Sequence, residues 1–397
     1  MAVLFRGART IDRDGPIDVA VTGHQIAEVG RPLEARGREV VDLDGALLLP
    51  AFVEAHLHVD KAWTWRPDLP ALSLREAIAH WKTVKAHHTG EELRRRGRSL
   101  LDRLLRFGTT AARTHADVDG YVGLAAVESL LALRREYAGR FTLQVVAYAS
   151  SAMTPRDPAD LRLLEDAVAM GADVVGGVPN LDGDPRACID VLLDVAMRHG
   201  RPLDLHIDEG PPRAGVWVEY LADRVLERRP AHSVTASHCC ALSAVSDPEA
   251  SRIIEKIRAA GISVVACPTT NLFLQEADAA DPTWRGVTRI RSLRRAGVTV
   301  AIASDNLRDV YYPYGQGNML ETAWVAALAA RLGPREVPAL LDMVSTEAAR
   351  AIGLGPWGLA PGAAADLVAF PGDAHLLADR PAPLLVMAAG RWVISPR

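Results

Sequence analysis

Residues 46–60 read ALLLPAFVEAHLHVD, an apolar run that ends in two histidines separated by one residue. Seven more runs of this kind follow along the chain: TTAARTHADV (109–118), FTLQVVAYAS (141–150), DVVGGVPN (173–180), PLDLHIDEG (202–210), SVTASHCC (233–240), ISVVACPTTN (262–271) and VTVAIASDN (298–306). Their early parts are apolar, as in strands buried on both faces, and most of them end in a polar side chain. Eight parallel strands are the number that closes a barrel.

The segments between these runs have helical periodicity. Three examples, with Arg and Lys on one face and Leu, Ile or Ala on the other, are LREAIAHWKTVKAHH (74–88), EELRRRGRSLLDRLLRF (91–107) and ASRIIEKIRAAG (250–261). Strands that alternate with such helices predict an α/β fold, a distorted (β/α)8 or TIM barrel with the helices as its outer ring. Active sites of these barrels gather at the carboxyl ends of the strands, where the polar side chains stand.

The two ends of the chain depart from this alternation. Short strands with Gly and Asp turns are indicated by VLFRGARTI (3–11), DVAVTGHQIAEVG (18–30), EVVDLDGALLLP (39–50) and the segment 365–394. Neither end alone can bury a sheet face, so we expect the two to pair as one small β-sandwich. The predicted domains are a composite sandwich of residues 1–50 and 360–397 and a barrel of residues 51–359.

Composition narrows the class of function. Of the 397 residues, 49% are hydrophobic, which suffices for one large core and a smaller satellite. A formal net charge of -4 argues against a nucleic-acid partner. No apolar run reaches the roughly 18 residues that cross a bilayer, and the start of the chain lacks the order of a signal peptide. We therefore expect a cytoplasmic protein that does not bind membranes, and a homo-oligomer is compatible with the sequence.

The four cysteines are consistent with the reducing environment of the cytoplasm. Cys188, Cys239, Cys240 and Cys267 lie in or near apolar stretches, and adjacent Cys239 and Cys240 are poor disulfide partners for each other. We interpret all four as buried, reduced thiols.

A metal centre is indicated at the mouth of the barrel. His56 and His58 stand two apart at a strand end, so both side chains point to the same side and can face one ion. His206, His238 and Asp305 stand at the ends of the fifth, sixth and eighth runs. If the barrel closes, the five side chains converge, and imidazole and carboxylate groups suit zinc or iron.

Taken together, the motifs resemble the amidohydrolase superfamily and, within it, the branch of cytosine deaminase and N-isopropylammelide amidohydrolase. The resemblance spans nearly the whole chain and rests on FVEAHLHVDK, RTHADVD, LQVVAYA, GADVVGGVPN, DLHIDEG, VTASH, NLFLQ, RGVTRI, ASDNLRD and PGAAADLVAF. It implies that one divalent metal ion, zinc or iron, is bound by His56, His58, His206 and Asp305. DVVGGVPN has no counterpart of the lysine that bridges two metals in binuclear relatives, so a single metal is expected.

The resemblance also implies a hydrolytic deaminase of an amino-substituted nitrogen heterocycle, a cytosine-like pyrimidine, a triazine or a related ring. In this interpretation metal-activated water attacks the amino-bearing carbon and His238 holds the attacking water or the oxygen it leaves. Glu209, in the pattern HxxE, carries a proton to a ring nitrogen, and Asp305 passes one to the departing amine. Supporting roles at the strand ends are expected for Asp60, His115, Asp117 and Asp208.

Two positions depart from the cytosine deaminase pattern. Ser150 stands where the relatives have a glutamine that reads the ring edge, and Asn306 stands where cytosine deaminase has a second aspartate. A site built to hydrogen-bond one ring edge rejects rings without the complementary groups, so we expect altered specificity. Near the mouth, Lys61, Trp63 and Arg308 are as consistent with a structural rim as with binding of an anionic or larger ring.

Two other functions remain as alternatives. One is hydrolysis of a cyclic amide or another C–N bond, because the same metal site serves both reactions. The other is a barrel that has become a non-catalytic scaffold. Glu209 at HxxE and the missing bridging lysine favour deamination, and the complete set of ligands favours an enzyme.

Overall fold

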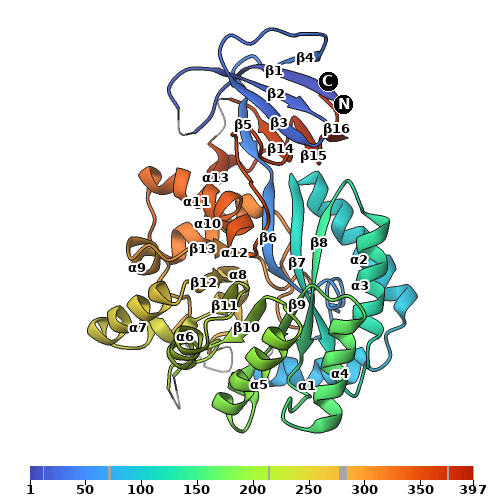
Figure 1. Cartoon of the computed structure of the whole chain (residues 1–397), viewed down its shortest axis with the longest axis vertical. Coiled ribbons are helices and arrows are strands. Elements are labelled where there is room, and N and C mark those ends of the chain that lie inside the picture. Colours follow the sequence, from blue (N-terminus) through green and yellow to red (C-terminus); the bar gives the residue numbers. More distant parts are fainter. Residues whose placement is uncertain (12, 70–72, 213–214, 277–283, 373–374, 397) are drawn as a thin grey trace.

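The computed structural model describes residues 1–397 except 12, 70–72, 213–214, 277–283, 373–374 and 397. At its centre is an eight-stranded sheet whose spatial order follows the chain: β6 (Phe52–Leu57), β7 (Thr109–Val118), β8 (Thr142–Ala149), β9 (Val174–Gly177), β10 (Leu203–Ile207), β11 (Val234–His238), β12 (Ser263–Ala266) and β13 (Val300–Ile302). All neighbouring strands in it pair in parallel. A parallel bridge between Leu57 and Asp305 joins the last strand to the first. The predicted (β/α)8 barrel is confirmed (Figure 1).

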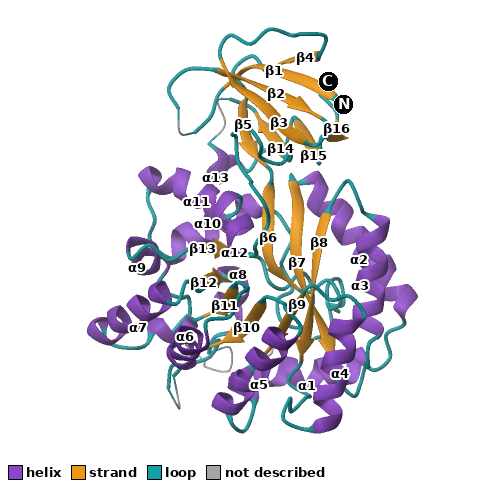
Figure 2. Ribbon diagram, in the orientation of Figure 1, coloured by secondary structure: helices purple, strands orange, loops and turns teal. Residues whose placement is uncertain are grey.

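Most helices lie around the sheet (Figure 2). Their apolar side chains share one buried core with those of the strands. The helices of the catalytic domain are α1 (Leu74–Lys85), α2 (Gly90–Arg106), α3 (Ala125–Glu136), α4 (Pro158–Ala169), α5 (Pro185–Arg198), α6 (Trp217–Arg228), α7 (Asp247–Ala259), α8 (Pro268–Leu274), α9 (Ile290–Arg295), α10 (Met319–Ala329), α11 (Val337–Met343) and α12 (Thr346–Ala351). In α2, for example, Leu93, Leu100 and Leu104 are buried while most arginines of the same helix stay accessible. Ser73 caps the start of α1 through a reciprocal pair of hydrogen bonds with Glu76.

Residues 74–88 are an exception to the predicted outer ring. α1, which covers most of them, contributes Trp81 and Lys85 to a cavity at the carboxyl ends of the strands. The expectation that this helix lies in the outer ring is therefore wrong. The link between β6 and β7 contains a second helix, α2, which packs against α3 and β7 in the ring.

The ends of the chain form two four-stranded sheets with a common core. One has the order β3 (Gln25–Gly30), β2 (Ile17–Thr22), β1 (Ala2–Ala8), β4 (Glu39–Asp42), and the other β16 (Arg391–Ile394), β15 (Leu385–Ala388), β14 (Leu367–Phe370), β5 (Leu47–Pro50). Phe5 and Val19 from the start of the chain share this core with Leu367 and Met387 from its end. The predicted composite sandwich is confirmed, whereas the exact limits of the two domains stay a prediction.

The run 46–60 is divided between the two domains. Its first part, β5, pairs antiparallel with β14 in the sandwich, and only its second part, β6, enters the barrel. Pro50 ends β5, since a proline has no N–H for a ladder. The four cysteines are free and buried, as expected. Among the described helices, none has both the length and the apolar character needed to span a bilayer.

Candidate active site

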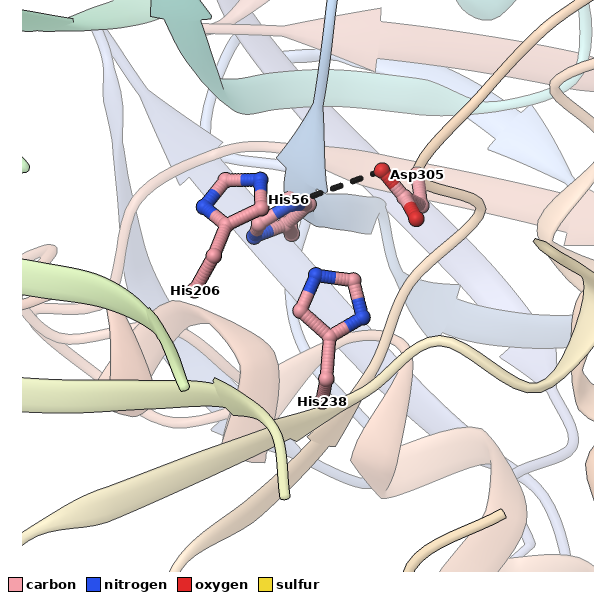
Figure 3. A group of neighbouring side chains, drawn as sticks. All are labelled: His56, His206, His238 and Asp305. Carbon is pink, nitrogen blue, oxygen red and sulfur yellow. Dashed lines mark ion pairs between the residues drawn. The ribbon is translucent and has the colours of Figure 1, made fainter. Parts of the chain in front are cut away.

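Three histidines and one aspartate meet at the carboxyl ends of the barrel strands (Figure 3). His56 lies in β6, His206 in β10 and His238 at the end of β11, and Asp305 follows β13. One ligand atom from each lies within 4.8 Å of the others, and all four residues are buried. The predicted convergence of these strand ends therefore occurs.

His58 lies against the same group. Its Nε2 is 3.1 Å from Nε2 of His206 and 3.3 Å from Oδ1 of Asp305. Nε2 of His56 is 3.5 Å from the same carboxylate oxygen. All residues that the sequence analysis predicts as metal ligands are thus in one cluster.

The chemistry of this cluster fits a divalent metal ion. Nε2 of His56, Nε2 of His238 and Oδ1 of Asp305 are buried and have no hydrogen-bond partner among the described residues. Burial and the neighbouring histidines hold the pKa of His206 well below its ordinary value, so this imidazole stays neutral with a lone pair free. Burial alone would raise the pKa of Asp305, but the imidazoles of His56 and His58 outweigh burial and keep that pKa low. Neutral imidazoles beside a carboxylate are ligands for zinc or iron.

A chain of hydrogen bonds holds His56 from the inside of the barrel. Its Nδ1 is 2.9 Å from Oγ of Ser237, which donates to Asp204 at 2.9 Å. Arg113 in turn donates to Asp204 at 2.7 Å, and both members of this ion pair are fully buried. His115 stacks on His56 with 4.1 Å between ring centroids. The orientation of His56 is therefore fixed by groups behind it.

A cavity opens directly beside the cluster. The catalytic residues that the sequence analysis predicts, Glu209, His238 and Asp305, all line it. Burial raises the pKa of Glu209 above its ordinary value, against the opposing effect of His238. A carboxyl group with a raised pKa is suited to taking up and releasing a proton near neutral pH.

The two predicted substrate-binding residues line the same cavity. Ser150 donates its hydroxyl hydrogen to Asp119 and lies 3.4 Å from the ammonium group of Lys85. Asn306 donates its side-chain N–H to Asp309 at 2.8 Å, so its amide oxygen remains available as an acceptor.

One wall of the cavity is a group of buried charges. Lys61 and Lys85 donate to Asp117 at 2.9 and 2.7 Å, and the indole N–H of Trp81 donates to it at 2.8 Å. Asp60 accepts the backbone N–H of Asp117 at 3.1 Å. The sequence analysis missed Trp81 and Lys85, although their spacing of four residues places them on one face of a helix.

Other candidates have supporting positions. Asp208 accepts the backbone N–H groups of Trp217 and Val218 at 2.9 and 2.8 Å and so holds the start of α6. Trp63 and the guanidinium of Arg308 stack on each other at 5.3 Å, and neither is among the described residues that line the cavity.

Comparisons with known proteins agree with this architecture. Residues 72–394 match the amidohydrolase family. The structure of 5-methylcytosine deaminase from Klebsiella pneumoniae, liganded with 5-fluorocytosine, is 31% identical and has a TM-score of 0.90, covering 99% of this chain and 98% of that one. N-isopropylammelide isopropylaminohydrolase from Burkholderia multivorans is 32% identical with a TM-score of 0.87 and the same coverage. Pterin deaminase of Rhizobium rhizogenes is 30% identical over 88% of this chain and 77% of its own length.

Fold and site define a metal-dependent barrel hydrolase. The chain belongs to the amidohydrolase family, as its sequence motifs predict, and is an enzyme that acts on carbon–nitrogen bonds.

Proposed function

We propose that this enzyme removes an amino group by hydrolysis from a nitrogen heterocycle, a cytosine-like pyrimidine, a triazine or a related ring such as a pterin. The observation that carries the proposal is that Glu209, His238 and Asp305 line one cavity together with the histidine cluster. The similar proteins support it, since they are a 5-methylcytosine deaminase, an N-isopropylammelide isopropylaminohydrolase and a pterin deaminase.

In the proposed site, His56, His58, His206 and Asp305 hold one divalent metal ion, zinc or iron. When bound, the ion would supply a Lewis acid that makes a water molecule more acidic at neutral pH. The barrel fixes the backbone of these residues at the strand ends.

Glu209 transfers the first proton in this proposal. Its carboxylate takes a proton from the attacking water and delivers it to a ring nitrogen, which makes the adjacent amino-bearing carbon more electrophilic. Its raised pKa fits a group that must both accept and release a proton.

His238 and Asp305 act on the other atoms of the reaction. His238 uses its unpartnered Nε2 to hold the oxygen that adds to the ring carbon, while its Nδ1 lies 3.4 Å from the side-chain oxygen of Asn271. Asp305 takes the second proton from the oxygen that has added to the ring and passes it to the departing amine. The C–N bond then breaks, and ammonia or a small amine leaves as a neutral molecule.

Asn306 and Ser150 are proposed to select the ring. The free amide oxygen of Asn306 can accept a ring N–H, whereas the short side chain of Ser150 leaves room for Lys85 at this wall. A ring that presents an N–H to Asn306 is therefore favoured over one that presents an acceptor there.

The test is an ammonia-release assay on metal-replete enzyme with cytosine, isocytosine, 5-methylcytosine, creatinine, ammelide-type triazines and pterins. Release from at least one ring, dependent on added zinc or iron, is the expected result. Ring opening of a cyclic amide without release of ammonia would replace deamination with the alternative C–N hydrolysis.

A further inference from the structure

The active-site cavity continues into a larger groove beside it. Among the residues that line both are Leu74, Ile78, Lys82, Leu181 and Glu209. The groove passes Arg75 on α1 and reaches Trp217 at the start of α6. A ring held at the histidine–aspartate cluster therefore has open space next to it on the side of Glu209.

The part of the groove next to the cavity is apolar. Leu74, Ile78 and Val178 form its walls, and Leu181 stands at its edge with 47% of its surface exposed. A ligand that covers these side chains removes apolar surface from water, which favours binding. This section therefore favours a ligand that is apolar where it leaves the ring.

A cation without a described acidic partner lies at the same junction of cavity and groove. Lys82 is half-buried, and in the described part of the chain its hydrogen bond goes to the backbone oxygen of Ser151 at 3.4 Å. The chain has three other lysines, and each forms an ion pair with a carboxylate: Lys61 and Lys85 with Asp117, and Lys256 with Glu219 and Asp223.

A second cation lies further along the same helix. Arg75 is exposed, lines the groove and precedes Lys82 by seven residues, which puts both on one face about 10 Å apart. No described carboxylate lies within ion-pair distance of either side chain. The groove thus combines apolar side chains with two cations that have no described ion-pair partner, and the carboxyl groups of Glu209 and Glu276 line it as well.

We propose that this groove binds an arm on the substrate ring, apolar next to the ring and carrying a carboxylate that pairs with Lys82. The inference rests on the proposed function, because it places the reacting ring in the neighbouring cavity. A longer arm would bring its acid to Arg75 as well. A bare pyrimidine or triazine would leave the groove filled with water and would not reach Arg75.

The experiment compares two substrates that share a ring and differ in the arm. The pairs are 5-methylcytosine with 5-(2-carboxyethyl)cytosine, and pterin with a pterin that carries a carboxyl group. In the wild type, the acidic member should have the higher kcat/KM. In Lys82→Met its kcat/KM should fall about 10- to 100-fold more than that of the bare ring, because only the acidic member loses a charge-assisted hydrogen bond. Lys82→Arg should restore most of the difference.

Lys256→Met is the matched control, since it removes the same charge from the outside of the barrel and should change neither substrate. An equal loss for both members of a pair in Lys82→Met, or no preference for the acid in the wild type, would overturn the inference.

The deaminated products, in which oxygen replaces the amino group, allow a separate test of the groove. Their affinity, measured by calorimetry, separates the inference from the proposed function. If no ring releases ammonia, the proposed function fails. The groove assignment would still stand if the acidic product binds tightly to the wild type and about tenfold or more weakly to Lys82→Met. Equal binding to both proteins would remove the assignment as well.

Discussion

Asp305 donates its backbone N–H to the carbonyl oxygen of His56 at 3.0 Å, across the seam between the last and first strands of the barrel. The same seam carries the parallel bridge from Leu57 to Asp305. Closure of the barrel therefore brings two proposed metal ligands together. The two residues are separated by most of the catalytic domain in sequence, so the site exists only when the barrel is complete.

Asp305→Asn tests the proposed metal site with little disturbance of the backbone. Asp305 has a φ of 66°, a left-handed conformation that Asn tolerates and Ala does not. The substitution removes the negative charge and should lower the metal content to on the order of a tenth of an equivalent. Elemental analysis of the purified variant measures this, with circular dichroism to show that the barrel has folded. A full equivalent of metal with wild-type turnover would exclude Asp305 as a ligand.

Ser237→Ala tests the hydrogen bonds behind His56. Ser237 is a positioning residue, because its hydroxyl lies between His56 and Asp204 and does not line the cavity. We expect about 10- to 100-fold weaker metal binding, as for other lost partners of ligating histidines. Competition with a chelator gives the affinity. Ser251→Ala, which removes an exposed hydroxyl on α7, is the control and should leave the affinity unchanged.

Much of the fold follows from local features of the sequence. Each barrel strand carries its own apolar run and its own polar end, so the repeat could be recognised without knowing any long-range contact. The division of residues 46–60 between the two domains could not be recognised, because the apolar residues of β5 continue directly into β6. What separates them is the partner of each strand, β14 for one and β7 for the other, and this is a property of the tertiary structure.

Of the residues of the candidate site, some could be predicted from the sequence and others could not. Residues at strand ends, such as His206 and Asp305, could be assigned because the barrel brings all strand ends to one mouth. Trp81 and Lys85 could not be assigned to the site, since periodicity shows which face of α1 is buried but not what that face covers. In the structure the helix lies over the mouth, so its buried face meets Asp117 instead of the outside of the sheet.

Glu209→Gln separates proton transfer from metal binding. The amide has nearly the same shape as the carboxyl group but cannot exchange a proton, so metal content should stay near the wild-type value. Turnover should fall by roughly 100- to 10,000-fold, the usual contribution of general acid–base catalysis. Metal analysis and the ammonia assay on the same preparation provide both values. Near-normal turnover in this variant would contradict the role of Glu209 as proton carrier.

Asp366 gives a prediction for stability that is independent of the metal site. It immediately precedes β14, where its backbone oxygen accepts the N–H of Ala51 and its carboxylate accepts that of Ala389 at 3.2 Å. Burial raises the pKa of Asp366 from 3.8 to about 6, although the hydrogen bonds act in the opposite direction. Between about pH 4 and pH 6 the folded protein therefore holds a proton that the unfolded chain has released.

The sign of the effect follows from this difference in protonation. Stability from Asp366 is highest below about pH 4 and is lost as the pH rises through 6, by roughly 3 kcal/mol in all. Asp366→Asn cannot ionise, so its free energy of unfolding relative to the wild type should rise by about that amount between pH 4 and pH 7 and then stay constant. Urea unfolding of both proteins measures the difference, and other carboxyl groups cancel because they are common to both. A difference that does not change with pH would mean that Asp366 ionises in the folded protein as it does in the unfolded chain.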